Sequence, residues 1–243
     1  MIPTQIKIFL AGACLCACAH GQAPAGLELG QFPGDSDIGV VSRPGTGTYD
    51  AATGSYTIGS SGANMWFGSD AMHFVWVSEG SDTSIAADIN FVGTSAQPHR
   101  KACLVIRQNL TPGSPYVDVA VHGDGLTSLQ FRAVQDGPTK EIQSDLASPK
   151  RVRLDKIGDT IYLSDSRAGE DPQPSGCSFG LHLTGPYYIG LAVSAHDNAA
   201  FETAVFSHVV IAQPSPAAAV PRPGVKIITL PTGDRRVAPI ASP

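Results

Sequence analysis

The chain is poor in charge and has no long hydrophobic run. Only 15% of its 243 residues are charged, and its formal net charge is −5. General nucleic-acid-binding proteins are usually basic, so this balance argues against nucleic acid as a partner. No stretch reaches the roughly 18 apolar residues that a membrane-spanning helix needs. The sequence therefore predicts no transmembrane span.

Several catalytic and metal-binding signals are also missing. There is no G-x-x-x-x-G-K-[ST] phosphate loop, and the histidines show neither an H-x-x-x-H nor an H-E-x-x-H spacing. No helical period of useful length runs between the turn signals. What the chain has in abundance is turn formers, with 26 Gly and 19 Pro. Few charges and many turn formers are typical of an all-β protein with many loops.

Apolar and polar residues alternate along five central runs, at 84–92, 102–108, 116–121, 127–134 and 150–155. A period of two indicates strands with one buried face and one solvated face. About a dozen short strands at this spacing are typical of a sandwich or barrel. The length fits a two-sheet antiparallel jelly-roll sandwich best. The predicted fold class is therefore all-β.

The polar positions of these strands form one candidate ligand platform, which we expect on a concave sheet. The ligand-binding candidates are Arg107, Tyr116, Asp118, Gln130, Arg132, Arg151 and Tyr188. Arginine forks bind anionic groups bidentately, carboxylates and amides bind hydroxyls, and aromatic rings stack on sugars. The pattern predicts a non-catalytic carbohydrate- or glycan-binding module, with anionic glycans as candidate ligands. Alternatively, the arginines pair with carboxylates across strands, at roughly 0.2–1 kcal/mol each.

Other uses of the same face stay open. Asp88 and Asp118 are expected on one face, about 9.6 Å apart across an intervening strand. That separation suits an inverting glycoside hydrolase, which is the enzymatic alternative. A third alternative is a cell-envelope domain that binds another protein through this face. Trp66 and Trp76 are further aromatic candidates for sugar stacking.

Metal ligands are sparse in the sequence. The histidines are scattered, so no zinc site is predicted. Hard cations prefer carboxylates and carbonyls, which leaves Asp37, Asp70 and Asp197 as candidates for a structural Ca²⁺ ion. No other cofactor is expected.

The N-terminus has the features of an export signal. Lys7 precedes an apolar segment at 8–19, and Ala17-Cys18-Ala19 is an A-x-A-like cleavage site. We expect a signal peptide at 1–23, and hence a periplasmic, outer-membrane-associated or extracellular protein. The segment 15–18 is also similar to a bacterial lipobox, in which case Cys18 would carry a lipid anchor.

Composition divides the rest of the chain in two. We expect an ordered sandwich at 27–212. Residues 213–224 are rich in Pro and Ala, which is typical of an extended linker. Residues 225–236 predict one strand and a turn with nothing to pack on, so 213–243 is expected to be a linker and a poorly ordered tail. Outside the signal segment, Cys103 and Cys177 allow one disulfide or two free thiols.

A series of short segments, in this order, resembles one bacterial family. They are Asp37-Ile38-Gly39, Tyr56-Thr57-Ile58, Gly62-Ala63-Asn64-Met65-Trp66, His73-Phe74-Val75-Trp76, His99-Arg100-Lys101-Ala102, Ile106-Arg107-Gln108, His122-Gly123-Asp124-Gly125, Leu129-Gln130-Phe131-Arg132, Tyr188-Ile189-Gly190-Leu191 and Ser194-Ala195-His196-Asp197. The resemblance is to the concanavalin A-like lectin/glucanase superfamily. Within it, the chain is similar to bacterial domains of unknown function akin to the C-terminal domain of some β-xylosidases.

This resemblance covers roughly 27–211 and implies a concanavalin A-like sandwich. Some relatives of this kind precede a Tol-type β-propeller, and the segment 232–236 is similar to the lead-in of such a propeller. The laminarinase-like enzymes of the superfamily carry an E-x-D-x-x-E strand motif, which this sequence lacks. The resemblance therefore implies the fold but not that hydrolase activity.

Overall fold

The computed structural model describes residues 29–167, 170–220 and 222–240. Nine strands form sheet A, in the spatial order β1 (Gly34–Ile38), β6 (Met72–Glu79), β15 (Tyr187–Ser194), β8 (Lys101–Arg107), β9 (Tyr116–His122), β10 (Thr127–Arg132), β11 (Thr139–Gln143), β18 (Arg235–Pro239) and β17 (Val225–Thr229). Seven strands form sheet B, in the order β14 (Gln173–Gly180), β13 (Thr160–Ser166), β12 (Arg151–Ile157), β7 (Thr83–Phe91), β16 (Glu202–Ala212), β3 (Ser55–Ser60) and β2 (Thr46–Asp50). The short strands β4 (Met65–Trp66) and β5 (Ser69–Asp70) form a separate hairpin, and η1 (Pro216–Ala219) is a 3₁₀ turn.

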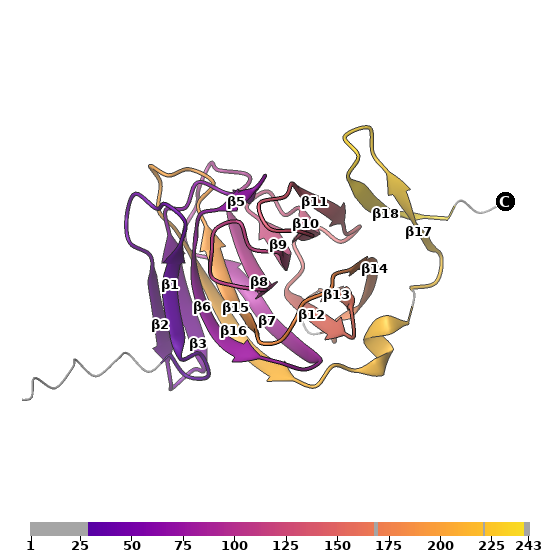
Figure 1. Cartoon of the computed structure of the whole chain (residues 1–243), viewed down its shortest axis with the longest axis horizontal. Helices are drawn as coiled ribbons and strands as arrows, with labels where there is room; N and C mark the ends of the chain where they lie inside the picture. Colours follow the sequence, from indigo (N-terminus) through magenta and orange to yellow (C-terminus); the bar gives the residue numbers. More distant parts are fainter. Residues whose placement is uncertain (1–28, 168–169, 221, 241–243) are drawn as a thin grey trace, which may run out of the picture.

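The two sheets are connected in the manner of a jelly roll. The chain passes from β6 in sheet A to β7 in sheet B and back to β8 in sheet A, and later it passes from β14 in sheet B to β15 in sheet A and back to β16 in sheet B. The described strand pairs are antiparallel, except for the parallel pair of β11 and β18. Figure 1 shows the two layers side by side. The predicted all-β, two-sheet sandwich is confirmed.

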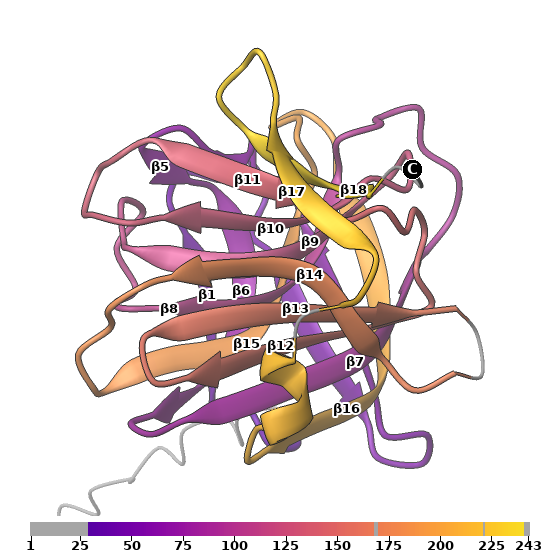
Figure 2. The ribbon, with the colours of Figure 1, turned by 90° about the vertical axis from the view of Figure 1, so that its right-hand side faces the viewer.

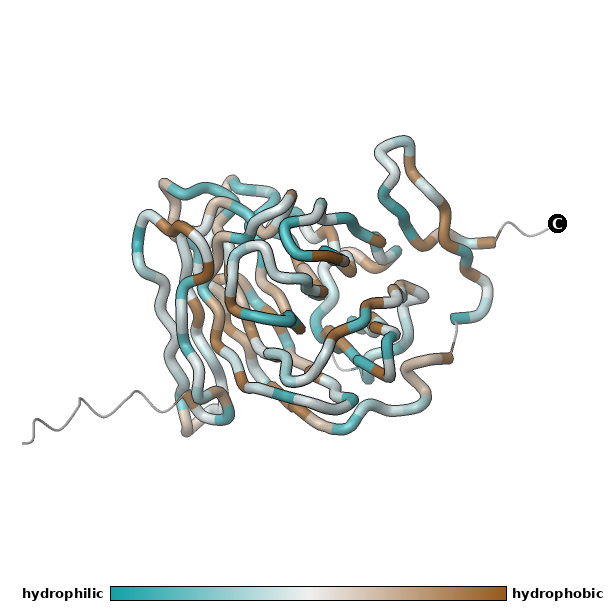
Figure 3. Tube along the Cα trace, in the orientation of Figure 1, coloured by the Kyte–Doolittle hydropathy of each residue, from teal (hydrophilic) through white to brown (hydrophobic). Residues whose placement is uncertain are grey.

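The main core fills the space between the sheets. It is built from the apolar positions of the alternating runs, including Leu104 and Ile106 of β8, Val119 of β9 and Leu154 of β12. Figure 3 shows hydrophobic segments recurring along the strands, with hydrophilic turns between them. A strand side chain points to alternate faces, so these residues are inward and their neighbours point outward. The predicted inward positions are therefore correct.

A second hydrophobic cluster covers part of the outward face of sheet A. Met65 from the β4–β5 hairpin packs there with Met72, Phe74, Val105 and other outward residues of the sheet. This outer cluster means that sheet A has apolar packing on both faces. The expectation of one buried and one solvated face is wrong for sheet A. The β4–β5 hairpin, which is distant in sequence from the central strands of the sheet, folds over the outward face.

The two cysteines of the described region are free thiols, and both are buried. Cys103 belongs to the outer cluster of sheet A, and Cys177 belongs to the main core. The predicted signal peptide at 1–23 and the predicted lipid anchor at Cys18 lie outside the described residues. Among the residues that are described, no helix has the length and apolar character of a membrane span.

The C-terminal segment extends sheet A. Strands β17 and β18 form a hairpin, and β18 pairs with β11 in parallel, so the hairpin stands at the edge of the sheet (Figures 1 and 2). Val237 of β18 is only 3% exposed and belongs to the main core. The segment was expected to have nothing to pack on. That expectation is wrong, because the end of the sandwich beside β14 offers it an apolar surface.

This packing predicts different costs for two valine truncations. Val237→Ala should lower the free energy of unfolding by about 1–3 kcal/mol, since it removes buried methyl groups from the core. Val220→Ala is the matched control, because Val220 is 58% exposed, and exposed substitutions usually change stability by less than about 0.5 kcal/mol. Urea unfolding of the full chain measures both. Equal, small effects would show that β18 is not part of the core in solution.

Candidate functional site

Two arginines and one aspartate form a buried ion cluster on the outward face of sheet A. The Arg132 guanidinium donates two hydrogen bonds to the Asp70 carboxylate, from Nη2 to Oδ1 at 2.7 Å and from Nη1 to Oδ2 at 3.0 Å. Arg107 Nη2 lies 3.4 Å from Asp70 Oδ2. All three side chains are fully buried. Burial lowers the pKa of Arg107, while the Asp70 carboxylate acts in the opposite direction.

The two guanidinium groups also bind backbone carbonyls of the loops around them. Arg132 donates to the Phe67 carbonyl from Nε and Nη2, at 3.2 Å each, and to Thr139 Oγ1 at 3.2 Å. Arg107 donates to the Thr111 carbonyl at 2.6 Å. Because Asp70 and Phe67 belong to the β4–β5 hairpin, Arg132 fixes that hairpin to the sheet. We call Arg107, Asp70 and Arg132 the ion cluster.

The predicted arginines do not form one open platform. Arg107 and Arg132 are covered in the ion cluster, whereas Arg151 lies in β12 of sheet B. There, Arg151 Nη1 lies 2.9 Å from Asp88 Oδ1. Arg151 is thus paired across strands, as the alternative interpretation expected, whereas Arg107 and Arg132 pair with Asp70, which that interpretation did not name. The alternation of residues along a strand shows which side is outward, but it does not show which sheet the strand joins.

The expected carboxylate pair is separated by the sandwich itself. Asp88 points outward from β7 of sheet B, and Asp118 points outward from β9 of sheet A. The main core therefore lies between them. The prediction of two carboxylates on one face is wrong, and with it the geometry of an inverting hydrolase built on this pair.

The three calcium candidates are also apart. Asp70 is engaged by two arginines. Both carboxylate oxygens of Asp37 accept from the Gly45 amide, and one is 2.9 Å from His73 Nδ1. Asp197 accepts from the Ala199 amide at 2.8 Å. Within the described ranges, no group of three or more His, Cys, Asp or Glu side chains is arranged to hold a metal ion.

A pocket of about 370 Å³ opens on the outward face of sheet A, beside the β4–β5 hairpin. Its lining residues are Asn64, Trp66, Phe67, His99, Lys101, His122, Leu126, Gln130, Glu141 and His196. We call it the Trp66 pocket. Four neighbouring strands build its floor, since Lys101 of β8 pairs with His122 of β9, and Gln130 of β10 pairs with Glu141 of β11. The hairpin that carries Trp66 forms a wall.

Lys101 is the buried cation of the Trp66 pocket. Its ammonium donates to Asn64 Oδ1 at 2.9 Å and to the Met65 carbonyl at 3.0 Å, and it lies 5.3 Å from the centre of the Trp66 ring. Burial lowers the pKa of Lys101, and the Asp118 carboxylate partly offsets this effect. Lys101 therefore holds the hairpin and the Trp66 ring in place from below.

His122, Gln130 and Glu141 form a hydrogen-bonded row. His122 Nδ1 lies 2.9 Å from the Leu126 carbonyl, so it carries a proton and donates. Gln130 Nε2 lies 3.3 Å from His122 Nε2 and donates to Glu141 Oε2 at 3.4 Å. The amide donates to both partners only if His122 is neutral. Burial lowers the pKa of His122 to about 3, in agreement with this assignment.

Two buried polar atoms in the same region, Oε1 of Gln130 and Oγ of Ser128, have no hydrogen-bond partner among the described residues. Asp118 is buried as well, and the Cys103 thiol and the Gln130 backbone amide donate to it. Burial raises the pKa of Asp118 to about 8, an effect that the Lys101 ammonium partly offsets. Buried polar groups are normally satisfied, so these atoms indicate a place for hydroxyl or water donors. Gln130 presents its free acceptor from the pocket lining itself.

His99 and His196 stand at the rim of the Trp66 pocket. Their ring centres are 5.3 Å apart, and the His99 and His122 ring centres are 6.1 Å apart. His196 has a φ of 58°, an uncommon value for a residue with a side chain. Partial burial lowers the pKa of His196, and the nearby Lys101 and His99 lower it further. Both rings add flat surface to the lining of the pocket.

The predicted ligand-binding residues lie in different places in the structure. Gln130 lines the Trp66 pocket, whereas Tyr116 and Asp118 are buried and are not among its lining residues. The Tyr116 hydroxyl donates to the Met65 carbonyl at 3.2 Å, and burial raises its pKa. Tyr188 packs against Trp76 at a ring distance of 4.8 Å, away from the pocket.

Lys101 and His99 were missed as site residues, although the sequence held a signal for one of them. Lys101 directly precedes the run at 102–108 and has the parity of its polar positions, so the alternation predicts that its side chain points outward. Nothing local indicates that the hairpin would fold over Lys101. Trp66 was an aromatic candidate, and the structure places it in the pocket wall.

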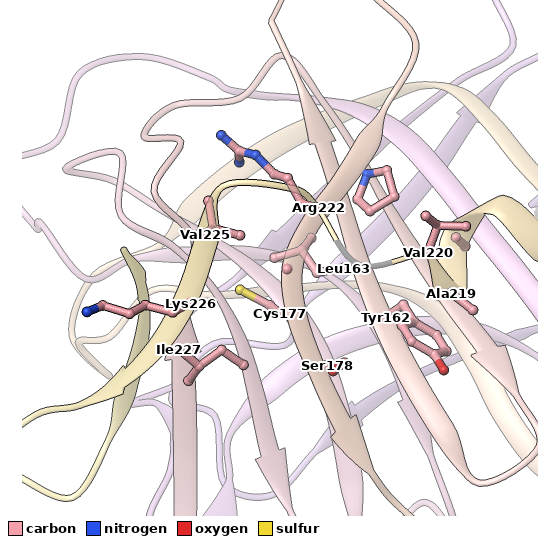
Figure 4. A pocket seen from close by; sticks show the side chains of 13 residues that line it. Tyr162, Leu163, Cys177, Ser178, Ala219, Val220, Arg222, Val225, Lys226 and Ile227 are labelled. Carbon is pink, nitrogen blue, oxygen red and sulfur yellow. The ribbon is translucent and has the colours of Figure 1, made fainter. Parts of the chain in front are cut away.

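A second, smaller pocket of about 230 Å³ lies where the C-terminal segment passes β13 and β14. Figure 4 shows Leu163 and Cys177 beside the strand that carries Val225 and Ile227. The lining is mostly apolar, and Arg222 at its edge is engaged by Asp145 at 2.7 Å. The segment Gly176–Gly180, whose first three residues line the pocket, matches G-x-S-x-G in sequence, but it runs within strand β14. A nucleophile elbow needs a strand-to-helix turn, so this match carries no catalytic site.

Comparison with known proteins supports the fold. No family model and no curated protein matches this chain. A solved structure of a functionally unknown protein from Saccharomyces cerevisiae is 13% identical, covers 74% of this chain and 97% of its own, and has a TM-score of 0.57. The carbohydrate-binding module CBM66 from Bacillus subtilis is 14% identical, with coverages of 74% and 96% and a TM-score of 0.49. A family 7 alginate lyase, A1-II′, is 11% identical, with coverages of 68% and 80% and a TM-score of 0.44. At these identities the likeness concerns the fold alone.

The ion cluster predicts a strong dependence of stability on Arg132. Arg132→Lys should lower the free energy of unfolding by about 3 kcal/mol or more, because an ammonium cannot reproduce the forked contacts and the buried Asp70 loses its partner. Arg151→Lys is the matched control on the more accessible Asp88 pair, where a loss of about 1 kcal/mol or less is expected. Urea unfolding measures both variants. Similar losses would contradict the central place of the ion cluster.

The buried neutral His122 predicts a pH dependence of stability. Its pKa is lowered in the folded state, so its contribution is fully present above the unfolded value of 6.5 and is lost as the pH falls toward about 3. Within that window the wild type should lose up to about 1.4 kcal/mol per pH unit more than His122→Asn. Chemical unfolding at a series of pH values gives the difference. Parallel pH curves for the two proteins would refute the neutral assignment.

Proposed function

We propose that the protein is a non-catalytic glycan-binding module that holds a sugar unit in the Trp66 pocket. The N-terminal sequence adds the proposal that it works after export, in the periplasm, at the outer membrane or outside the cell. A free or lipid-anchored form would present the pocket equally well, because the described sandwich begins after this segment.

The observation that carries the proposal is the combination of Trp66 with unpaired polar acceptors in one pocket. Sugar rings present an apolar face and a rim of hydroxyl groups, so they need a flat apolar surface beside hydrogen-bonding groups. Trp66 offers the surface, and Gln130 Oε1 offers a buried acceptor without a partner among the described residues. Asn64 and Glu141 add polar groups to the lining.

The charges favour a neutral sugar over an anionic one. The arginines first expected to bind an anion are paired with Asp70 and Asp88. In the pocket, the ammonium of Lys101 is already engaged by two oxygen acceptors. An added sugar carboxylate would also face Glu141. Hydroxyl donors, in contrast, would satisfy the acceptors that lack a partner.

Binding should depend on Trp66 and not on Trp76. On an array of neutral and acidic oligosaccharides, followed by calorimetry with the best probe, Trp66→Ala should weaken binding by at least about tenfold, or about 1.4 kcal/mol. Trp76→Ala is the matched control, since Trp76 lies in β6 of sheet A, whose outward face carries the pocket, but does not line the pocket itself.

Three results would contradict this proposal. They are a wild-type chain that binds no glycan, binding that survives Trp66→Ala, and release of sugar from the probe. Capture of a protein of the cell envelope without any glycan signal would favour the protein-interaction alternative instead.

A further inference from the structure

A second hollow adjoins the Trp66 pocket on the other side of the β4–β5 hairpin. It has a volume of about 650 Å³, and its lining includes Val40, residues of the hairpin and Asn198. Asn64, Trp66 and Phe67 line both this hollow and the Trp66 pocket. The two spaces are therefore separated by the hairpin alone, and Trp66 belongs to both.

Phe67 stands where the two hollows meet. Its side chain is 73% exposed, an unusual position for a phenylalanine. Its φ is 52°, and such a value costs free energy for a residue with a side chain unless its surroundings fix it. The surroundings do fix it, because its carbonyl accepts from Arg132 and from Thr139 Oγ1, at 2.9 Å in the second case. The ion cluster thus holds an aromatic ring out in solvent.

The apolar surface continues into the second hollow. Val40, in its lining, is 80% exposed. Asn198 supplies a polar group there, and its Oδ1 accepts from the Ser42 amide at 2.9 Å, which orients the side chain. Both hollows therefore combine apolar surface with amide groups, which is the mixture that sugars require.

We infer that the ligand is a chain of several sugar units, which occupies the Trp66 pocket with one part and crosses the Phe67 ring into the second hollow with another. This inference rests on the proposed function and specifies the length of the ligand. A single sugar unit would fill the Trp66 pocket, whereas only longer chains would reach the second hollow.

The test is the dependence of affinity on chain length. Calorimetry would use the wild-type chain with cello-, xylo-, manno- and chito-oligosaccharides of one to six units. For the series that binds, affinity should rise at least about tenfold between one and four units. Phe67→Asn should remove most of this gain, and asparagine tolerates the positive φ. Val40→Asn, at a residue that lines the second hollow and not the Trp66 pocket, should lower the affinity for four units and leave the affinity for the single unit within about twofold.

Two further variants separate the possible outcomes. Trp66→Ala should weaken binding at every length, and Val134→Asn, an exposed apolar residue outside both hollows, should change nothing. An affinity that is equal for one and six units, or a Phe67→Asn profile that matches the wild type, overturns this inference and leaves the proposed function standing. A wild-type chain that binds none of these probes overturns both.

Discussion

The ion cluster of Arg107, Asp70 and Arg132 is the interaction on which the functional face depends. Removing two guanidinium groups and a carboxylate from water is costly, and the cost is offset only by good geometry and by further hydrogen bonds. Both conditions are met, since the carboxylate is held in a fork and the remaining donors bind loop carbonyls. The cluster fixes a hairpin of two short strands, which Lys101 and Tyr116 also hold through the Met65 carbonyl. The wall of the Trp66 pocket and the exposed ring of Phe67 depend on these attachments.

The polar groups of the Trp66 pocket continue this arrangement. Lys101 binds the hairpin backbone from below, and its ammonium partly offsets the burial that raises the pKa of Asp118 to about 8. His122 is kept neutral and receives a hydrogen bond from Gln130. Among the described residues that line the Trp66 pocket, Gln130 Oε1 is an acceptor without a hydrogen-bond partner. An acceptor without a partner favours ligands that donate hydrogen bonds, as sugar hydroxyls do.

At the end of the sandwich beside β14, the C-terminal segment covers the apolar surface. Strand β18 pairs with β11 and places Val237 in the main core, so the last strands are part of the same hydrophobic unit as the central ones. Their addition in parallel to an otherwise antiparallel sheet is made possible by a long connection through η1, which passes the edge of sheet B. The linker before the hairpin lets it reach a distant sheet edge. The composition of the hairpin does not show which edge it will pair with, so the sequence did not predict this packing.

The sequence by itself determined the strands and their inward residues, because a period of two is a local property of the chain, and the inward residues Leu104, Val119 and Leu154 lie in the main core. It also identified Arg107, Arg132 and Gln130 as outward residues. Only the tertiary structure decided that Arg151 and Asp88 lie on the other sheet, that Asp70 comes from a remote hairpin, and that Arg107 and Arg132 are covered while Gln130 lines the Trp66 pocket. The reason is physical: strand pairing and loop placement are long-range contacts, and neither the period of a strand nor the identity of an arginine contains the position of its partner.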